Sequence, residues 1–248
     1  MNLYELAFTC CVYNSFTDFN NSYKVLQQEV EYSLNLFHLE HRKTLIAWLN
    51  KWGCRQFARD YHKAASDVLL AWHQEGHIAK ISRDKVLWEM NEEEIGQVGG
   101  IYDALAYKIA SKPARGDKLI PKTVGPTGAS KILFALRPKV AVPWDEAIRS
   151  GLKYSGDGLS YANYLKRVKK EIETLAVSCN ENGVRLFRVP EIIERSDSTI
   201  PQLIGEYFWV TETRKCYPPD HETLQRWSDW SRNSSMSAKP IINKDNSI

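Results

Sequence analysis

A tight turn, a short apolar helix and a single aspartate, Asp145, follow one another in one segment of the chain. Gly125 can adopt backbone angles that other residues avoid, and Pro126 after it suits the first position of a helix. A turn that leads into a helix N-terminus presents unpaired backbone amides and the positive end of the helix dipole. The segment therefore predicts a phosphate-binding turn, flanked by Lys122 and Lys131.

The predicted helix after this turn has one apolar face. Its members recur at i, i+3, i+4 and i+7, and they are Ala129, Ile132, Leu133 and Leu136. The same pattern is typical of a plain turn between two core helices, so the turn alone leaves that interpretation open.

The charge around this segment is locally basic. Ten Lys or Arg and four Asp or Glu lie between Ile101 and Lys153, a net charge of +6, whereas the whole chain of 248 residues carries +3. Such a local excess suits a polyanionic partner. A solvated helical surface would also account for it.

The run Val124-Gly125-Pro126-Thr127-Gly128-Ala129 resembles the hairpin of the helix-hairpin-helix DNA glycosylases, the endonuclease III and adenine glycosylase superfamily. In that family a catalytic aspartate follows the second glycine of the hairpin by twenty residues, which is the position of Asp145 here. The stretch 100–109 also resembles the helix that precedes the family's hairpin. The resemblance covers roughly residues 99–152.

The sequence departs from the family pattern at several points. Thr123 replaces the first glycine of the hairpin, and the first hairpin helix is shortened to little more than Asp117 to Lys122. Thr127 stands where the lyase members carry their Schiff-base lysine, and the cysteine quartet of the iron–sulfur members is absent. The first hundred residues do not resemble the family.

The resemblance implies a monofunctional DNA glycosylase, a hydrolase that removes a damaged or modified base and leaves an abasic site, in DNA repair or in defence against phage. Asp145 would stabilise the oxocarbenium-like sugar and activate water, while Glu146 would point to the surface. DNA is the expected partner, and no cofactor or metal is expected. The residues expected to bind the DNA backbone are Lys122, Thr123, Val124, Gly125, Thr127, Gly128 and Lys131. The aromatic residues expected to line a pocket for the flipped base are Trp144, Tyr102 and Trp88.

Two other classes of function stay open at this point. A noncatalytic DNA-binding protein could keep the hairpin, although it has no use for a carboxylate directed at phosphates. A helical scaffold could resemble the hairpin by chance, and salt-independent DNA binding would identify it.

The periodicity predicts an all-α fold, a helix-hairpin-helix glycosylase-like domain with additional helices on both sides. Helices are predicted over 23–37, 39–59, 64–72 and 160–176, with helix starts at Ser82 and Asn91 and an interruption at Gly99-Gly100. The best strand candidate is 207–211. The expected regions are an N-terminal helical region (1–98), the hairpin and aspartate segment (99–155), a C-terminal helical region (156–232) and a disordered tail (233–248).

The five cysteines are scattered without metal-ligand spacing, which favours a reducing compartment. The N-terminus has no basic region before its apolar residues, unlike a signal peptide, and no apolar run reaches the length of a membrane span. We expect a cytoplasmic monomer.

Overall fold

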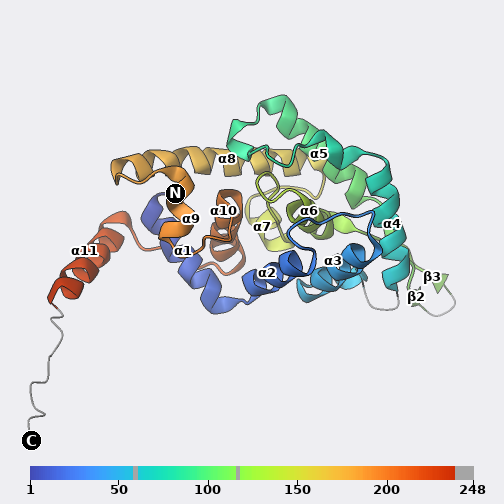
Figure 1. The fold of residues 1–248 in the computed structure, drawn as a ribbon, viewed down its shortest axis with the longest axis horizontal. Coiled ribbons are helices and arrows are strands. Elements are labelled where there is room, and N and C mark those ends of the chain that lie inside the picture. The colour runs from blue at the N-terminus through green and yellow to red at the C-terminus, as the bar shows by residue number, and fades with distance from the viewer. Residues whose placement is uncertain (58–60, 116–117, 238–248) are drawn as a thin grey trace, which may run out of the picture.

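A computed structural model describes residues 1–57, 61–115 and 118–237, and its fold is mostly helical, which confirms the all-α prediction (Figure 1). The α-helices are α1 (Leu3–Phe16), α2 (Phe19–Glu29), α3 (Leu39–Lys51), α4 (His62–Gln74), α5 (Glu92–Ala106), α6 (Gly125–Leu136), α7 (Glu146–Gly151), α8 (Gly158–Glu181), α9 (Val189–Ile192), α10 (Ile200–Phe208) and α11 (His221–Ser237). The 3-10 turns are η1 (Arg55–Phe57), η3 (His77–Lys80), η4 (Leu87–Glu89) and η5 (Leu186–Arg188), and a π-helical turn, η6 (Trp209–Thr213), follows α10.

Helix α6 lies in the middle of the molecule, with α8 and α5 along one side and α2 and α3 along the other (Figure 1). Its residues from Gly128 to Phe134 are all buried, because the helix packs on several sides. Hydrophobic side chains from Leu3 to Phe208 belong to one core cluster. The three helical regions expected from the sequence therefore contribute to a common core.

Helices α5 and α8 cross at two glycines. A Cβ atom on Gly99 would collide with the carbonyl oxygen of Gly158, and a Cβ on Gly158 would collide with that of Gly99. The prediction that Gly99-Gly100 interrupts a helix is wrong, because α5 continues through both residues. The predicted helix start at Asn91 is confirmed, since its side chain accepts a hydrogen bond from the Glu94 amide in a capping box.

Short strands, rather than a first hairpin helix, precede α6. Strand β1 (Ile109–Ser111) pairs antiparallel with β4 (Lys122–Thr123), and β2 (Ala114–Arg115) pairs with β3 (Lys118–Leu119). The prediction of a short helix from Asp117 to Lys122 is wrong for its described part; Asp117 itself lies outside the described residues. Pro113 and Pro121 lie between β1 and β4, and each disfavours helix in the residue before it.

Other element boundaries also differ from the predictions. Residues 207–211, predicted as a strand, lie in the end of α10 and the π turn, because their apolar side chains pack against helices. The helix start predicted at Ser82 is followed only by the 3-10 turn η4.

Three helices end at other residues than predicted. Helix α2 ends at Glu29, before Glu31 and Tyr32 take positive φ angles, and α3 ends at Lys51. Helix α11 reaches Ser237, so the predicted tail begins within a helix, and residues 238–248 lie outside the described residues.

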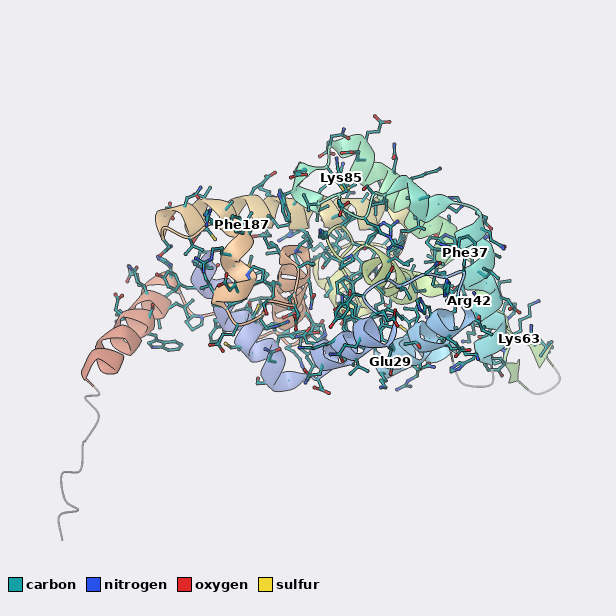
Figure 2. All side chains as sticks on the ribbon, viewed as in Figure 1. Glu29, Phe37, Arg42, Lys63, Lys85 and Phe187 are labelled. Atoms are coloured by element: carbon teal, nitrogen blue, oxygen red, sulfur yellow. The ribbon has the colours of Figure 1, made fainter. Side chains whose placement is uncertain are left out.

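A buried arginine ties α3 to its surroundings (Figure 2). The Arg42 guanidinium donates hydrogen bonds to the carbonyl oxygens of Leu36 and Phe37 and to Ser66 of α4. Donor groups of a buried guanidinium need such partners. This network fixes the loop that leads into α3, and α3 is followed by the segment that lines the site described next.

Candidate functional site

A cavity of about 330 Å³ is lined by residues of α1, α2, α6, α7 and α10, and we call it the Asp145 cavity. Its size falls within the range of about 300–1,000 Å³ that small-molecule sites occupy. Most of its wall is apolar or aromatic, with a few polar groups among them. Its lining residues are Tyr13, Phe19, Asn20, Trp52, Gly53, Thr127, Lys131, Phe134, Pro143, Trp144, Asp145, Ile148, Gln202, Gly205, Glu206 and Trp209.

Asp145 is the N-cap of the short helix α7, which fixes the direction of its carboxylate. Oδ1 accepts a hydrogen bond from the Ile148 amide at 2.8 Å. The Thr213 hydroxyl lies 3.3 Å from Oδ1 and 3.1 Å from Oδ2, and it donates to the carboxylate from the π turn. Asp145 is half-buried and lines the cavity, whereas Glu146 is exposed. The carboxylate is thus held from two sides while remaining part of the cavity wall.

Lys131 lies inside the molecule, in contrast to its expected place on the DNA-binding surface. Its side chain is 7% exposed, lines the Asp145 cavity, and donates from Nζ to the Trp52 carbonyl oxygen at 2.5 Å. Burial lowers the pKa of the Lys131 ammonium group, and the charge of Asp145 opposes this. Helix α6 is buried on all sides along this stretch, so its lysine has no route to the surface beside the turn.

Thr127, which stands at the position of the family's Schiff-base lysine, also lines the cavity. Its hydroxyl accepts a hydrogen bond from Arg149 Nη1 at 3.2 Å. The Arg149 guanidinium in turn lies 5.6 Å from the centre of the Trp144 ring. This arrangement joins the first turn of α6 to α7.

The end of the cavity formed by α2 and α10 contains a buried ion pair. Glu206 is 4% exposed and accepts hydrogen bonds from Arg195 at 2.6 and 2.9 Å. Burial raises the pKa of the Glu206 carboxyl, and the Arg195 guanidinium opposes that rise. Gln202 Nε2 donates to Glu206 Oε1 at 3.3 Å and to Asn20 Oδ1 at 3.1 Å. A polar network therefore forms part of the cavity wall, in addition to Asp145, Lys131 and Thr127.

Of the three aromatic residues expected in a base pocket, the structure brings one to the cavity. Trp144 is 1% exposed and lines it, with Tyr164 stacked at 5.3 Å. Tyr102 packs edge-on behind Trp144 and donates its hydroxyl to the Gly156 carbonyl oxygen. Trp88 is partly buried against the core, and neither it nor Tyr102 belongs to the cavity lining.

A second hollow, the hairpin depression, lies on the other side of Thr127. It is lined by Arg55, Gln56, Tyr61, Ser111, Pro113 and Lys122 to Thr127. Gly125 has a φ angle of 72°, as the expected turn requires, and Lys122 and Thr123 are exposed. The Val124 side chain is buried, and its carbonyl oxygen accepts a hydrogen bond from Gln56. Gly128 is buried beneath the turn, so a ligand on this face would meet the backbone of 122–127.

Some of the basic side chains in the segment 101–153 do not carry free positive charge at the surface. Arg137 is buried, and its guanidinium donates to the carbonyl oxygens of Ile78 and Ile81. Lys108 pairs with Glu75. In contrast, Lys112, Lys118 and Lys122 are exposed along the strands, and no ion pair involves them within the described ranges. In the described part of the chain, exposed lysines without an ion-pair partner are therefore present beside the hairpin depression.

Several cavity residues were missed by sequence reasoning: Tyr13, Phe19, Trp52, Gln202, Glu206, Trp209 and, behind Asp145, Thr213. They come from helices far from the hairpin in sequence, so no spacing rule linked them to Asp145. Across the described residues, no group of three or more His, Cys, Asp or Glu side chains is arranged to hold a metal ion. None of the described helices combines the length and the apolar character that crossing a membrane requires.

Comparisons with known proteins identify no relative of this chain. No protein-family model, no curated protein and no solved structure matches the chain. The function must therefore be inferred from the site itself.

Proposed function

We propose that this chain is a monofunctional DNA glycosylase that hydrolyses the N-glycosidic bond of a damaged or modified base and leaves an abasic site. The observation that carries the proposal is the joint position of Asp145 and the glycine turn. Thr127 lines both the Asp145 cavity and the hairpin depression, so a carboxylate and a candidate phosphate-binding turn flank the same residue. A strand bound at the turn would place a sugar near the cavity entrance, with its base inside.

The chemistry follows from the needs of an N-glycosidic bond. As the base departs, positive charge develops on the sugar, and a fixed carboxylate stabilises it without reorganising. The Ile148 amide and the Thr213 hydroxyl hold the Asp145 carboxylate, and Oδ2 keeps a free lone pair that can orient a water molecule. Water is the proposed nucleophile, because Thr127 cannot form an imine.

The cavity suits a flipped base. Phe19, Trp52 and Trp209 supply aromatic surface on which a base can stack, and the volume of about 330 Å³ leaves room for it. Aromatic packing fixes one of these rings, since Trp209 meets Tyr13 edge-on at 5.1 Å. The stacking surface is therefore organised before a ligand enters.

The backbone of DNA would lie on the hairpin depression. Gly125 gives the turn its left-handed backbone, and the amides that begin α6 have no preceding helical turn to bond with. Exposed lysines on the adjoining strands, Lys118 and Lys122 among them, supply positive charge. Because strands replace the first hairpin helix, we propose a strand-supported hairpin rather than the family's full motif.

The leading alternative is a noncatalytic protein that binds DNA through the same hairpin. A binding module gains nothing from a carboxylate held by two donors inside an aromatic cavity. The deciding experiment incubates the chain with duplex and single-stranded DNAs that contain oxidised, alkylated, mispaired or phage-type modified bases, and detects the released base by mass spectrometry. Release by the native chain that is slower by about 100-fold or more in Asp145→Asn supports the glycosylase. DNA binding without release of any of these bases supports the alternative. The base released would also separate repair from phage defence.

A further inference from the structure

The Asp145 cavity is lined by two groups of opposite charge that are not paired with each other. Among the described residues of its wall, Lys131 is the only one with a cationic side chain. Lys131 is 7% exposed, and no ion pair in the described part of the chain involves it or Asp145. The groups that hold Asp145, the Ile148 amide and the Thr213 hydroxyl, are neutral donors. The cavity therefore contains a positive and a negative charge, each without a described counterion.

The Lys131 ammonium group has donors to spare. It carries three N–H groups, and the Trp52 carbonyl oxygen accepts one of them at 2.5 Å. Nζ also lies over the Trp52 ring, 5.2 Å from its centre. Both of these partners are neutral, and a buried charge is costly unless it is paired. A ligand that brought negative charge to Nζ would supply the pairing that the described residues lack.

Hydrogen bonds between α6 and the segment before α7 fix the positions of the two charged residues. Ser130, which precedes Lys131, accepts a hydrogen bond from the Trp144 amide at 3.2 Å, and Trp144 directly precedes Asp145. The two charges are close enough to interact, since burial lowers the pKa of Lys131 and the charge of Asp145 opposes that change. They are nevertheless held apart as separate charges in one cavity wall.

We propose that Lys131 binds the negative charge of the base and is a second catalytic residue of the glycosylase reaction. The inference rests on the proposed function in taking the ligand to be a base. Breaking the N-glycosidic bond separates charge, because the sugar becomes positive while the base becomes negative. Asp145 stabilises the sugar, and Lys131 Nζ stabilises the base through a charge-assisted hydrogen bond. The two fixed charges of the cavity thus match the two charges of the transition state.

The protons of this scheme balance. The electron pair of the bond between C1′ and the base nitrogen passes to the base, which takes a proton from Lys131 Nζ. The oxygen of a water molecule adds to C1′, and its proton passes to Asp145. Solvent then carries that proton from Asp145 to Lys131, so one water molecule is consumed and both residues regain their starting states. Burial lowers the pKa of the Lys131 ammonium group and makes it a better proton donor.

The test uses free bases, so that it does not depend on catalysis. 5-Nitrouracil, an anion at neutral pH, and thymine, a neutral base of similar shape, are titrated into the full chain by calorimetry. We expect the native chain to bind the anion about tenfold more tightly, the gain that a hydrogen bond between charged groups gives. Lys131→Met should reduce this ratio to about twofold or less, whereas Lys51→Met, at an exposed position of α3, should leave it unchanged.

Lys131→Gln provides a second variant if Lys131→Met fails to fold. Its amide can still donate to the Trp52 carbonyl oxygen, while the positive charge is removed. This variant should also lose the preference for the anion. In DNA, both variants should release the base that the native chain releases about 100-fold more slowly, because each lacks one electrostatic stabiliser.

Equal binding of the two bases by the native chain, no binding of either, or an unchanged ratio in both Lys131 variants would overturn the inference. Undiminished base release by both variants would overturn it as well. Release of a base from DNA by a native chain without the preference for the anion would leave the glycosylase proposal standing alone. The preference without release from any DNA would remove the glycosylase proposal and keep Lys131 as an anion-binding group.

Discussion

The two hollows that meet at Thr127 differ in almost every physical property. The Asp145 cavity is lined largely by aromatic and other apolar side chains, and its charged groups, Asp145, Lys131 and Glu206, each have a hydrogen-bond partner. The hairpin depression offers backbone, a glycine turn and exposed lysine. The difference teaches that one helix, α6, can line two unlike hollows: its first turn borders the exposed depression, and its next turn forms the wall of the buried cavity.

The largest effect that separates the two hollows should come from Asp145→Asn. The substitution keeps the shape of the side chain and removes its charge, so base release should fall by about 100- to 1,000-fold. DNA affinity should change by less than about twofold, since the hairpin depression is untouched. Single-turnover excision and equilibrium binding measure the two quantities. Glu146→Gln, an exposed neighbour, is the matched control; equal losses in both variants would contradict the assignment.

Gly125→Val should show the reverse pattern, in which DNA affinity is the quantity that falls. A side chain in the left-handed region costs about 1–2 kcal/mol, and distortion of the turn should weaken DNA binding by about tenfold for every sequence. Binding assays with unrelated sequences test this, because backbone contacts carry no base information. Gly100→Ala, at an open position within α5, controls for the loss of a glycine. A loss confined to one sequence would argue against backbone binding at the turn.

Thr213→Val tests whether the π turn supports Asp145. The variant keeps the shape but loses the donor that contacts both carboxylate oxygens, and we expect base release to fall by about five- to tenfold. Thr213→Ser should restore most of the rate, with affinity for DNA unchanged in both variants. If Ser and Val behaved alike, the hydroxyl would have no part in the reaction.

Two lysines should respond differently to salt. Lys122 is exposed at the depression, so Lys122→Ala should reduce the slope of log affinity against log salt by about 0.9. Lys131 is buried in the cavity, so Lys131→Met should leave the slope unchanged. Titrations between about 50 and 200 mM salt decide the matter. An equal reduction in both variants would place Lys131 on the DNA surface.

The smallest expected effect is the pH dependence that Lys131 gives to the free energy of unfolding. Burial lowers the pKa of its ammonium group below 10.5, so between the two pKa values the unfolded chain binds more protons than the folded chain. The free energy of unfolding of the native chain, relative to Lys131→Met, should therefore increase as pH rises from neutrality towards 10.5. Melting temperatures of both chains across this range measure it. A difference that is constant with pH would mean that Lys131 stays fully charged in the fold.

The sequence predicted features of the fold and of the site that depend on local chemistry. The Asn91 cap and the Gly125 turn follow from short-range rules, and both are present. The helix predicted at 117–122 is wrong for its described part because of nearby prolines, and the strand predicted at 207–211 is wrong because tertiary packing outweighed the local pattern. The inward direction of Lys131 could not be predicted, since periodicity gives one buried face and α6 is buried all round. Glu206 and Thr213 reach the site only through the packing of α10 beside α6 and α7, which no spacing in the sequence records.

The π turn at Trp209–Thr213 makes the support of Asp145 depend on chain length. A π turn contains about one residue more than an α-helical turn, so it is equivalent to a single-residue insertion in α10. Removing one residue there would restore α-helical register and rotate Thr213 by about 100° away from the carboxylate. Every residue of the cavity wall could stay the same while the hydrogen bond to Asp145 disappeared. In related chains, a one-residue gap at this position would therefore mark the loss of that support more directly than any substitution.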